Sequence, residues 1–219
     1  VKGPKELIEG SDVIFAATSC AQAVETAEMY KPYLKNGQIY IDLNSAIPDV
    51  KKKLSEMLSD TCSFLDGAIM NFPKQFGLKC LIVVSGPMAK QMVGTLNSIG
   101  MNTSYIGEEI GQASAFKVVR SIFTKGLESV LIECMQAART CGIADQIFDS
   151  VVSYLSDKPV RNTLEVSVIT NPVHVKRRAL EIDGVNEMLE KLGVNNIISK
   201  ATSQKLHWLE EADVKGRLG

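Results

Sequence analysis

The first half of the chain alternates between short apolar runs and longer stretches in which apolar and polar residues recur with helical spacing. Short apolar runs bounded by polar turns predict buried strands, here at 13–17, 38–43, 63–70, 80–85 and 102–106. The amphipathic stretches predict helices at 4–9, 21–34, 48–59 and 88–99, with a loop at 71–79. This alternation is typical of a doubly wound α/β sheet that is at least partly parallel.

Beyond Gly107 the strand pattern stops and the remaining residues show helical spacing. The longest stretch, 111–139, has no proline and carries apolar residues on every side, which indicates a buried central helix. Residues 160–169 are ambiguous, and Asn171-Pro172 is expected to break the chain. Further helices are predicted at 145–155, 174–192 and 197–211, before a frayed tail at 212–219.

The predicted sheet lacks the phosphate-binding turn of a dinucleotide-binding domain. Neither a G-x-G-x-x-G pattern nor a P-loop occurs in the sequence. We therefore interpret 1–107 as a partial Rossmann-type domain whose first βαβ unit is missing, and expect the glycine turn upstream of Val1. Residues 108–219 are predicted to form an all-helical C-terminal domain that the long helix opens.

Two polar turns follow predicted strands at the edge where such sheets bind ligands. They are Ala17-Thr18-Ser19 and Asn44-Ser45-Ala46. Ser, Thr and Asn also favour loops and helix N-caps, so spacing alone leaves a purely structural interpretation open.

The long helix carries a polar row near its start, formed by Lys117, Ser121, Thr124 and Glu128. Offsets of three and four residues place these side chains on one helical face. A lysine at the start of a buried helix needs a partner, a water-filled cleft or a chemical role. The sequence leaves two interpretations open: Lys117 extends to solvent or pairs with a glutamate, or it takes part in chemistry.

Composition narrows the class of protein. The chain of 219 residues has a net charge of −1, which gives no support for a nucleic-acid partner. Lys51-Lys52-Lys53 is interpreted as a solvated helix face. The five cysteines have no metal-binding spacing, and three lie in apolar runs, so we expect no metal and a reducing, cytoplasmic compartment. No apolar run reaches the roughly twenty residues of a membrane span.

Four sequence patterns together resemble the β-hydroxyacid dehydrogenase group, which includes 6-phosphogluconate dehydrogenase. They are Asp42-Leu43-Asn44-Ser45-x-x-Pro48, Leu65-Asp66-Gly67-Ala68-Ile69-Met70, Ser85-Gly86-Pro87 and Gly111-x5-Lys117-x8-Gly126. Three further pieces are similar to a branch of NAD-binding, phosphogluconate dehydrogenase-like proteins with a C-terminal domain of unknown function. They are Ala115-Phe116-Lys117 with Thr124-Lys125-Gly126, His174-x2-Arg177-Arg178-Ala179-x-Glu181, and Lys200-Ala201-Thr202 with Leu206-x-Trp208.

The resemblance implies NAD or NADP as cofactor, a helical domain that commonly forms a homodimer, and a role for Lys117. Lys117 would be the general acid/base that takes the proton of the substrate hydroxyl, helped by an apolar wall that disfavours its charged form. The family's cofactor-contacting loops correspond to Ala17, Thr18, Asn44 and Ser45.

Substrate-binding positions depart from the family pattern. The family's serine-glycine-glycine loop corresponds to Ile69-Met70-Asn71, so Met70 and Asn71 replace it. Ser121 stands where the family has an asparagine, with Arg120 before it. His174, Arg177 and Arg178 form a cationic cluster suited to a carboxylate or phosphate, although a solvated helix face or a dimer contact explains it equally well.

The function we expect is oxidation of a small hydroxy acid, sugar-derived or phosphorylated, by an NAD(P)-dependent dehydrogenase. One alternative keeps the fold and reduces imines or aldehydes, since Ser121 replaces the asparagine. A second alternative is a non-catalytic dimeric ligand-binding protein, because a fold by itself does not establish a function.

Overall fold

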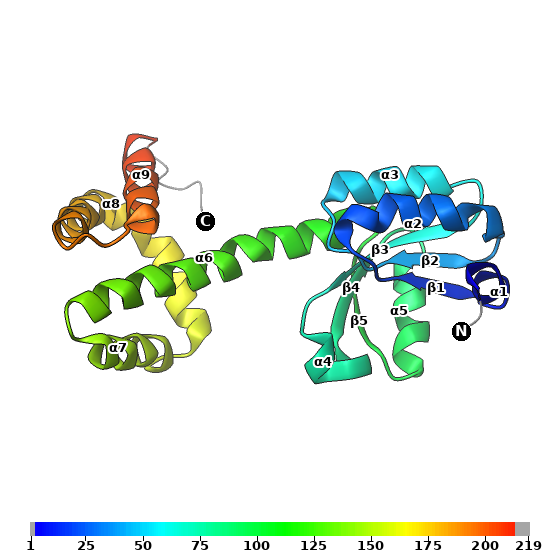
Figure 1. Cartoon of the computed structure of the whole chain (residues 1–219), viewed down its shortest axis with the longest axis horizontal. Helices are drawn as coiled ribbons and strands as arrows, with labels where there is room; N and C mark the ends of the chain where they lie inside the picture. The colour runs from blue at the N-terminus through cyan, green and yellow to red at the C-terminus, as the bar shows by residue number, and fades with distance from the viewer. Residues whose placement is uncertain (1–2, 213–219) are drawn as a thin grey trace. The chain divides into compact units, whose positions relative to one another are not determined.

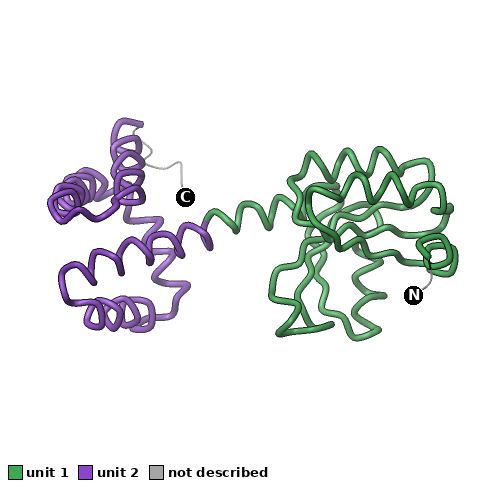
Figure 2. The backbone as a smooth tube through the Cα atoms, in the orientation of Figure 1, with its two compact units in different colours: residues 1–122 green, residues 123–219 purple. Residues whose placement is uncertain are grey.

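The computed structural model describes residues 3–212, and its first compact unit, 1–122, is built on a five-stranded sheet (Figures 1 and 2). The strands lie in the order β1-β2-β3-β4-β5. All neighbouring strands are parallel except β3 and β4, which are antiparallel. The predicted mixed α/β class is therefore confirmed. The strands are β1 (Val13–Ala16), β2 (Ile39–Asp42), β3 (Ser63–Ile69), β4 (Leu81–Ser85) and β5 (Asn102–Gly107).

Helices cover both faces of this sheet. In Figure 1, α2 and α3 lie over one face and α5 over the other. The segment 71–79, predicted as a loop, contains two short helical turns instead, and Pro73 at the first helical position favours the first of them. The helical segments of this unit are α1 (Pro4–Glu9), η1 (Cys20–Gln22), α2 (Ala23–Tyr30), η2 (Lys31–Tyr33), α3 (Pro48–Leu58), α4 (Pro73–Phe76), η3 (Gly77–Lys79) and α5 (Ala89–Ser98).

The core of the first unit is divided by the sheet into two layers. Tyr40 packs with Leu54 of α3 on one face, whereas the next residue, Ile41, packs with Met92 of α5 on the other. Successive residues of a strand point to opposite faces, so a strand buried on both faces needs consecutive apolar residues. This is the physical reason for the unbroken apolar runs in the sequence.

The second compact unit spans residues 123–219, and its described part, up to residue 212, is built from helices. The boundary between the units lies within α6 (Gln112–Thr140), so this helix belongs to both. The other helices are α7 (Ala144–Ser156), α8 (Val160–Lys191) and α9 (Ile197–Glu211). Within residues 3–212, no helix combines the length and the apolar character that crossing a bilayer requires.

The apolar side chains of α6 are less buried than the sequence predicts. Val119 is 65% exposed and Ile122 is 74% exposed, so the interpretation of α6 as a helix buried on every side is wrong for this single chain. Apolar residues on every side predict a buried helix only if other elements of the same chain pack against all of its faces. In this chain, part of the apolar surface of α6 has no such neighbour.

The break predicted at Asn171-Pro172 is also wrong. Pro172 lies inside α8, which runs without interruption through the ambiguous segment before it. An interior proline removes one backbone hydrogen bond, but the C-terminal half of α8 is held by packing of Val175 and Ala179 against Leu206 of α9. Tertiary packing therefore outweighs the local preference. From residue 213 onward, the predicted frayed tail lies outside the described residues.

Candidate active site

The two polar turns predicted at strand ends meet at the carboxyl edge of the sheet. Ala16 of β1 is paired in register with Asp42 of β2, so the residues that follow them are neighbours. The backbone N–H of Thr18 donates to Asn44 Oδ1 at 2.6 Å, and Thr18 Oγ1 donates to the same oxygen at 3.2 Å. Asn44 is buried while Thr18 is exposed, so the amide fixes the turn that carries the exposed hydroxyl.

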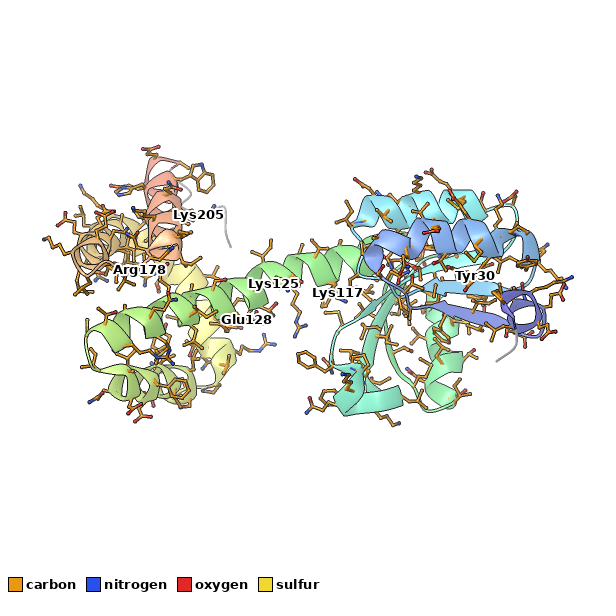
Figure 3. The ribbon with its side chains drawn as sticks, in the orientation of Figure 1. Tyr30, Lys117, Lys125, Glu128, Arg178 and Lys205 are labelled. Carbon is orange, nitrogen blue, oxygen red and sulfur yellow. The ribbon has the colours of Figure 1, made fainter. Side chains whose placement is uncertain are left out.

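Lys117 reaches the same edge from the second turn of α6. Its Nζ donates to Ser45 Oγ at 2.7 Å, and Figure 3 labels Lys117 on the part of α6 that belongs to the first unit. Lys117 is half-buried and Ser45 is exposed. The structure thus brings together three of the predicted residues, Lys117, Ser45 and Asn44, with Thr18 beside them.

The start of α6 is anchored by buried side chains from β3 and β4. The N–H of Ser114 donates to Asp66 Oδ2 at 2.8 Å, and Ser114 Oγ donates to it at 2.9 Å. The N–H of Ala113 donates to Ser85 Oγ at 3.0 Å. The first N–H groups of a helix have no partner within the helix and carry partial positive charge. A carboxylate and a hydroxyl therefore fix the position of the helix one turn before Lys117.

Lys51 connects this anchor to the turn that holds Thr18. Its Nζ lies 2.6 Å from Asp42 Oδ2 and 3.3 Å from Asp66 Oδ1, and the side chains of all three residues are 0% exposed. Lys51 Nζ also donates to the backbone carbonyls of Asp42 at 2.7 Å and Gly67 at 3.2 Å. Asp42 in turn accepts from Asn44 Nδ2 at 2.5 Å. We call Asp42, Lys51 and Asp66 the buried ionic row.

The solvated interpretation of Lys51 is therefore wrong, although Lys52 and Lys53 are exposed. The sequence contained a signal that could have identified it: Lys51 precedes Leu54 and Leu58 by three and seven residues, which is one helical face. Both leucines are 0% exposed, as is Lys51. A cation at a core position needs carboxylates within reach, and Asp42 and Asp66 belong to two of the motifs noted above.

Burial affects the protonation of the Asp42 carboxyl in the buried ionic row. Burial raises the pKa of the Asp42 carboxyl above its usual value, while the Lys51 ammonium and the hydrogen bond from Asn44 lower it in part. Asp66 adds a smaller upward effect on that pKa because it is a second negative charge. One cation thus compensates two carboxylates in a site without water contact.

Three predicted substrate-binding residues lie around one cavity of the first unit. Arg120 Nη1 donates to the backbone carbonyl of Met70 at 3.2 Å, and Asn71 lies on the same cavity wall. The hydroxyl of Ser121, the fourth predicted substrate-binding residue of the first unit, is already engaged as a donor: its Oγ donates to the Lys117 carbonyl at 2.9 Å within α6. Met70 and Asn71 follow β3, so they lie at the same edge of the sheet as Thr18 and Asn44. Ala17 is exposed directly after β1.

The remaining predicted cations lie on α8 in the second compact unit. Arg177 pairs with Glu181 one turn away. Arg178 Nη2 donates to Thr170 Oγ1 at 3.2 Å, and His174 is exposed. Figure 3 labels Arg178 on this helix. The surface salt bridge matches the solvated interpretation for Arg177, whereas Arg178 lines a cavity between α7 and α8.

Sequence and structure comparisons place the chain among known proteins. Residues 138–209 match the family described as a domain of unknown function, DUF1932. A conserved hypothetical protein from Sinorhizobium meliloti 1021 is 30% identical, with 93% of this chain and 68% of that one covered at a TM-score of 0.60. An uncharacterized 28.5 kDa protein of Methanothermus fervidus is 27% identical over 210 residues, 96% of this chain and 80% of its own length.

Three further structures relate the fold to oxidoreductases. Conserved protein MTH1747, whose structure is described as similar to 3-hydroxyacid dehydrogenases, is 25% identical over 98% of this chain and 81% of its own, with a TM-score of 0.61. An imine reductase from Myxococcus stipitatus, solved with NADP+, is 16% identical over 100% of this chain and 86% of its own, with a TM-score of 0.81. A variant of that reductase, solved with NAD+, is 17% identical over 97% of this chain and 78% of its own, with a TM-score of 0.80. The reductases show a shared Rossmann-like fold.

The class that fold and comparisons define is that of the 3-hydroxyacid dehydrogenase-like proteins. Within that class, the chain belongs to the family whose C-terminal domain is DUF1932.

Proposed function

We propose that this protein is an NAD(P)-dependent oxidoreductase that oxidises the hydroxyl of a small hydroxy acid, a class that includes sugar-derived and phosphorylated acids. The observation that supports it most directly is the position of Lys117. Its amine hydrogen-bonds Ser45 at the carboxyl edge of the parallel strands, where ligands of such sheets bind. The buried anchor at Asp66 and Ser85 fixes the helix that carries the amine.

The residues at this edge fit the polar end of a dinucleotide. Thr18 and Ser45 expose hydroxyl oxygens that can accept hydrogen bonds from a ribose or a carboxamide. Asn44 is committed to Thr18 and Asp42, so we assign it to positioning the turn, with Ala17 supplying backbone beside it. When bound, NAD(P) supplies the acceptor for a hydride. The NAD- and NADP-bound reductases support the choice of cofactor, without deciding between the two forms.

In this proposal Lys117 moves the proton of the substrate hydroxyl. As the C–H bond breaks, the hydroxyl oxygen develops alkoxide character, and an amine in contact with it accepts the proton. Ser45 holds the amine in place through its hydroxyl oxygen. Arg120 at the adjoining cavity, with Asn71 beside it, binds the acid group of the substrate, and a guanidinium suits a carboxylate or a phosphate.

The proposal is tested by replacing Lys117 with methionine in the full-length protein and assaying a panel of hydroxy acids with NAD+ and NADP+. We expect turnover to fall by about a hundredfold or more, with an unchanged melting temperature. Lys125→Met, an exposed position on the same helix, should leave turnover intact. Equal turnover in the wild type and Lys117→Met would remove Lys117 from the mechanism.

One observation favours a second candidate, an imine or aldehyde reductase. The family asparagine is replaced by Ser121, whose hydroxyl is engaged with the Lys117 carbonyl. Faster NAD(P)H oxidation with cyclic imines than NAD(P)+ reduction with any hydroxy acid would establish this reaction. Cofactor binding without turnover of either class would instead indicate a ligand-binding protein.

We further propose a cytoplasmic homodimer. The exposed apolar side chains of α6, Val119 and Ile122 among them, are a surface that a second copy would cover. The thiols of all five cysteines are free, as a reducing compartment would keep them. Light scattering after size exclusion should give twice the mass of the chain, and Ile122→Glu should shift that mass toward the monomer.

A further inference from the structure

The cavity beside Arg120 has walls that the proposed proton transfer does not use. Its volume is about 430 Å³, within the range typical of small-molecule sites. It lies against β4 and β5, on the face where Val83 packs with Ala113 of α6. Its lining is mainly apolar, from Met70, Leu81, Val83, Ile106 and Phe116, with Asn71, Ser104, Tyr105 and Arg120 as the polar members.

The polar members include one cation and no carboxylate. Arg120 makes no ion pair within residues 3–212, and its one hydrogen bond there is to the Met70 carbonyl. A guanidinium has five N–H donors, so most of this group is available to a ligand. Met70 fixes the guanidinium next to the apolar wall, and the cavity therefore presents an anion-binding head and an apolar body.

The cavity lies beside Lys117 at the same edge of the sheet. Lys117 contacts Ser45 after β2, and Arg120 contacts Met70 after β3. β2 and β3 are adjacent parallel strands, about 4.8 Å apart, and three residues of helix rise by about 4.5 Å. The amine, the guanidinium and the cavity thus follow one another along the edge of the sheet.

We propose that this cavity selects the substrate: a small carboxylic acid whose carboxylate binds Arg120 and whose apolar substituent fills the space over β4 and β5. The inference deepens the proposed function and rests on it. The inference restricts the substrate to hydroxy acids with an alkyl or aromatic substituent and excludes sugar-like, polyhydroxylated acids. The hydroxyl groups of a polyhydroxylated chain would lose their hydrogen bonds to water and find no partners among Leu81, Val83 and Phe116.

The test uses hexanoate and its neutral isostere hexanamide as probes, with affinities measured by NMR titration of the full-length protein. We expect hexanoate to bind at least about tenfold more tightly than hexanamide, since charge-assisted hydrogen bonds are roughly twice as strong as neutral ones. Arg120→Gln should abolish that preference. Ser104→Trp, placed at an exposed strand position, should fill the cavity and weaken both probes at least about tenfold. Arg139 is an exposed arginine of α6 outside the cavity. Arg139→Gln is therefore the matched control and should leave the affinities of hexanoate and hexanamide unchanged.

Equal affinities of the two probes for the wild type, or an unchanged preference in Arg120→Gln, would overturn the inference. So would absence of binding together with a change of oligomeric mass in Ser104→Trp, because a second copy would then cover the cavity. Hexanoate has no hydroxyl, so its binding does not depend on turnover. Binding as expected, with no oxidation of any hydroxy acid, would refute the proposed function alone; oxidation of hydroxy acids without hexanoate binding would refute this inference alone.

Discussion

Replacement of Lys51 by methionine is the sharpest test of the buried ionic row. Methionine keeps the length and most of the volume of the lysine side chain but removes the ammonium. Two carboxylates, Asp42 and Asp66, then remain at 0% exposure without their cation. The two backbone carbonyls that accept from Lys51 also lose their donor.

The expected cost is set by the unpaired charges. Removing one partner of a buried ion pair costs about 3–5 kcal/mol because the remaining charge stays desolvated. Here one cation serves two carboxylates, so we expect the free energy of unfolding to fall by about 4 kcal/mol or more at pH 7. A domain is typically stable by about 5–15 kcal/mol, and the variant should therefore be close to the limit of folding.

The loss of stability caused by Lys51→Met should become smaller as the pH is lowered. Burial already raises the pKa of Asp42 in the wild type, which means that the folded state favours the protonated carboxyl relative to the unfolded state. Without Lys51 this preference becomes stronger, so protonation at lower pH neutralises the charge that destabilises the variant. Adding Asp42→Asn to Lys51→Met should recover part of the stability, because the asparagine oxygen can still accept from Asn44 Nδ2.

Urea unfolding followed by circular dichroism at pH 7 and pH 5 measures these differences. Lys52→Met, the exposed neighbour on the same helix, is the control and should lie within about 0.5 kcal/mol of the wild type. If Lys51→Met and Lys52→Met unfold at the same urea concentration, the ionic row does not stabilise the fold and the reasoning is refuted.

Two further predictions concern the second unit. His207 Nε2 donates a hydrogen bond to Asp183 Oδ2, and this bond raises the pKa of His207. Its contribution to stability is present below the pKa of the unfolded state and is lost as the pH rises through the pKa of the folded state. Asp183→Asn should lower the pKa of His207 in an NMR titration, and an unchanged value would contradict the assignment. Glu133 accepts from the N–H groups of Ile198 and Ser199 at the start of α9, both at 2.8 Å, so Glu133→Gln should lower the free energy of unfolding by about 1–2 kcal/mol, with exposed Glu128→Gln as a control near zero.

The alternation of strands and helices could be predicted because it follows from burial on both faces of the sheet. Tyr40-Ile41 and Val83-Val84 are consecutive apolar pairs, and each pair supplies both faces of its strand. The start of α6 was predicted to within one residue, at Gly111 against Gln112. The continuity of α8 through Pro172 could not be predicted, because the packing of α9 that holds it involves residues distant in the sequence.

The site was predictable only in part. The polar turns at Thr18 and Asn44 were identified from their position after strands, and the structure shows them hydrogen-bonded. The role of Lys51 depends on Asp42 and Asp66, which reach it from two different strands. A sequence gives the spacing of each residue along its own element, but not which side chains of other elements will surround it.

The buried ionic row has a consequence for how the strands of the sheet find their alignment. Asp42 is opposite Asp66, and Asp66 is opposite Ser85, so all three point to one face. A slip of β2 by a single residue would turn the Asp42 carboxylate toward the apolar layer around Met92 and Leu65 and leave Lys51 facing a hydrocarbon side chain. A misaligned sheet would therefore bury unpaired charges, so the ion pairs that position Thr18 and α6 also favour the native register of the strands.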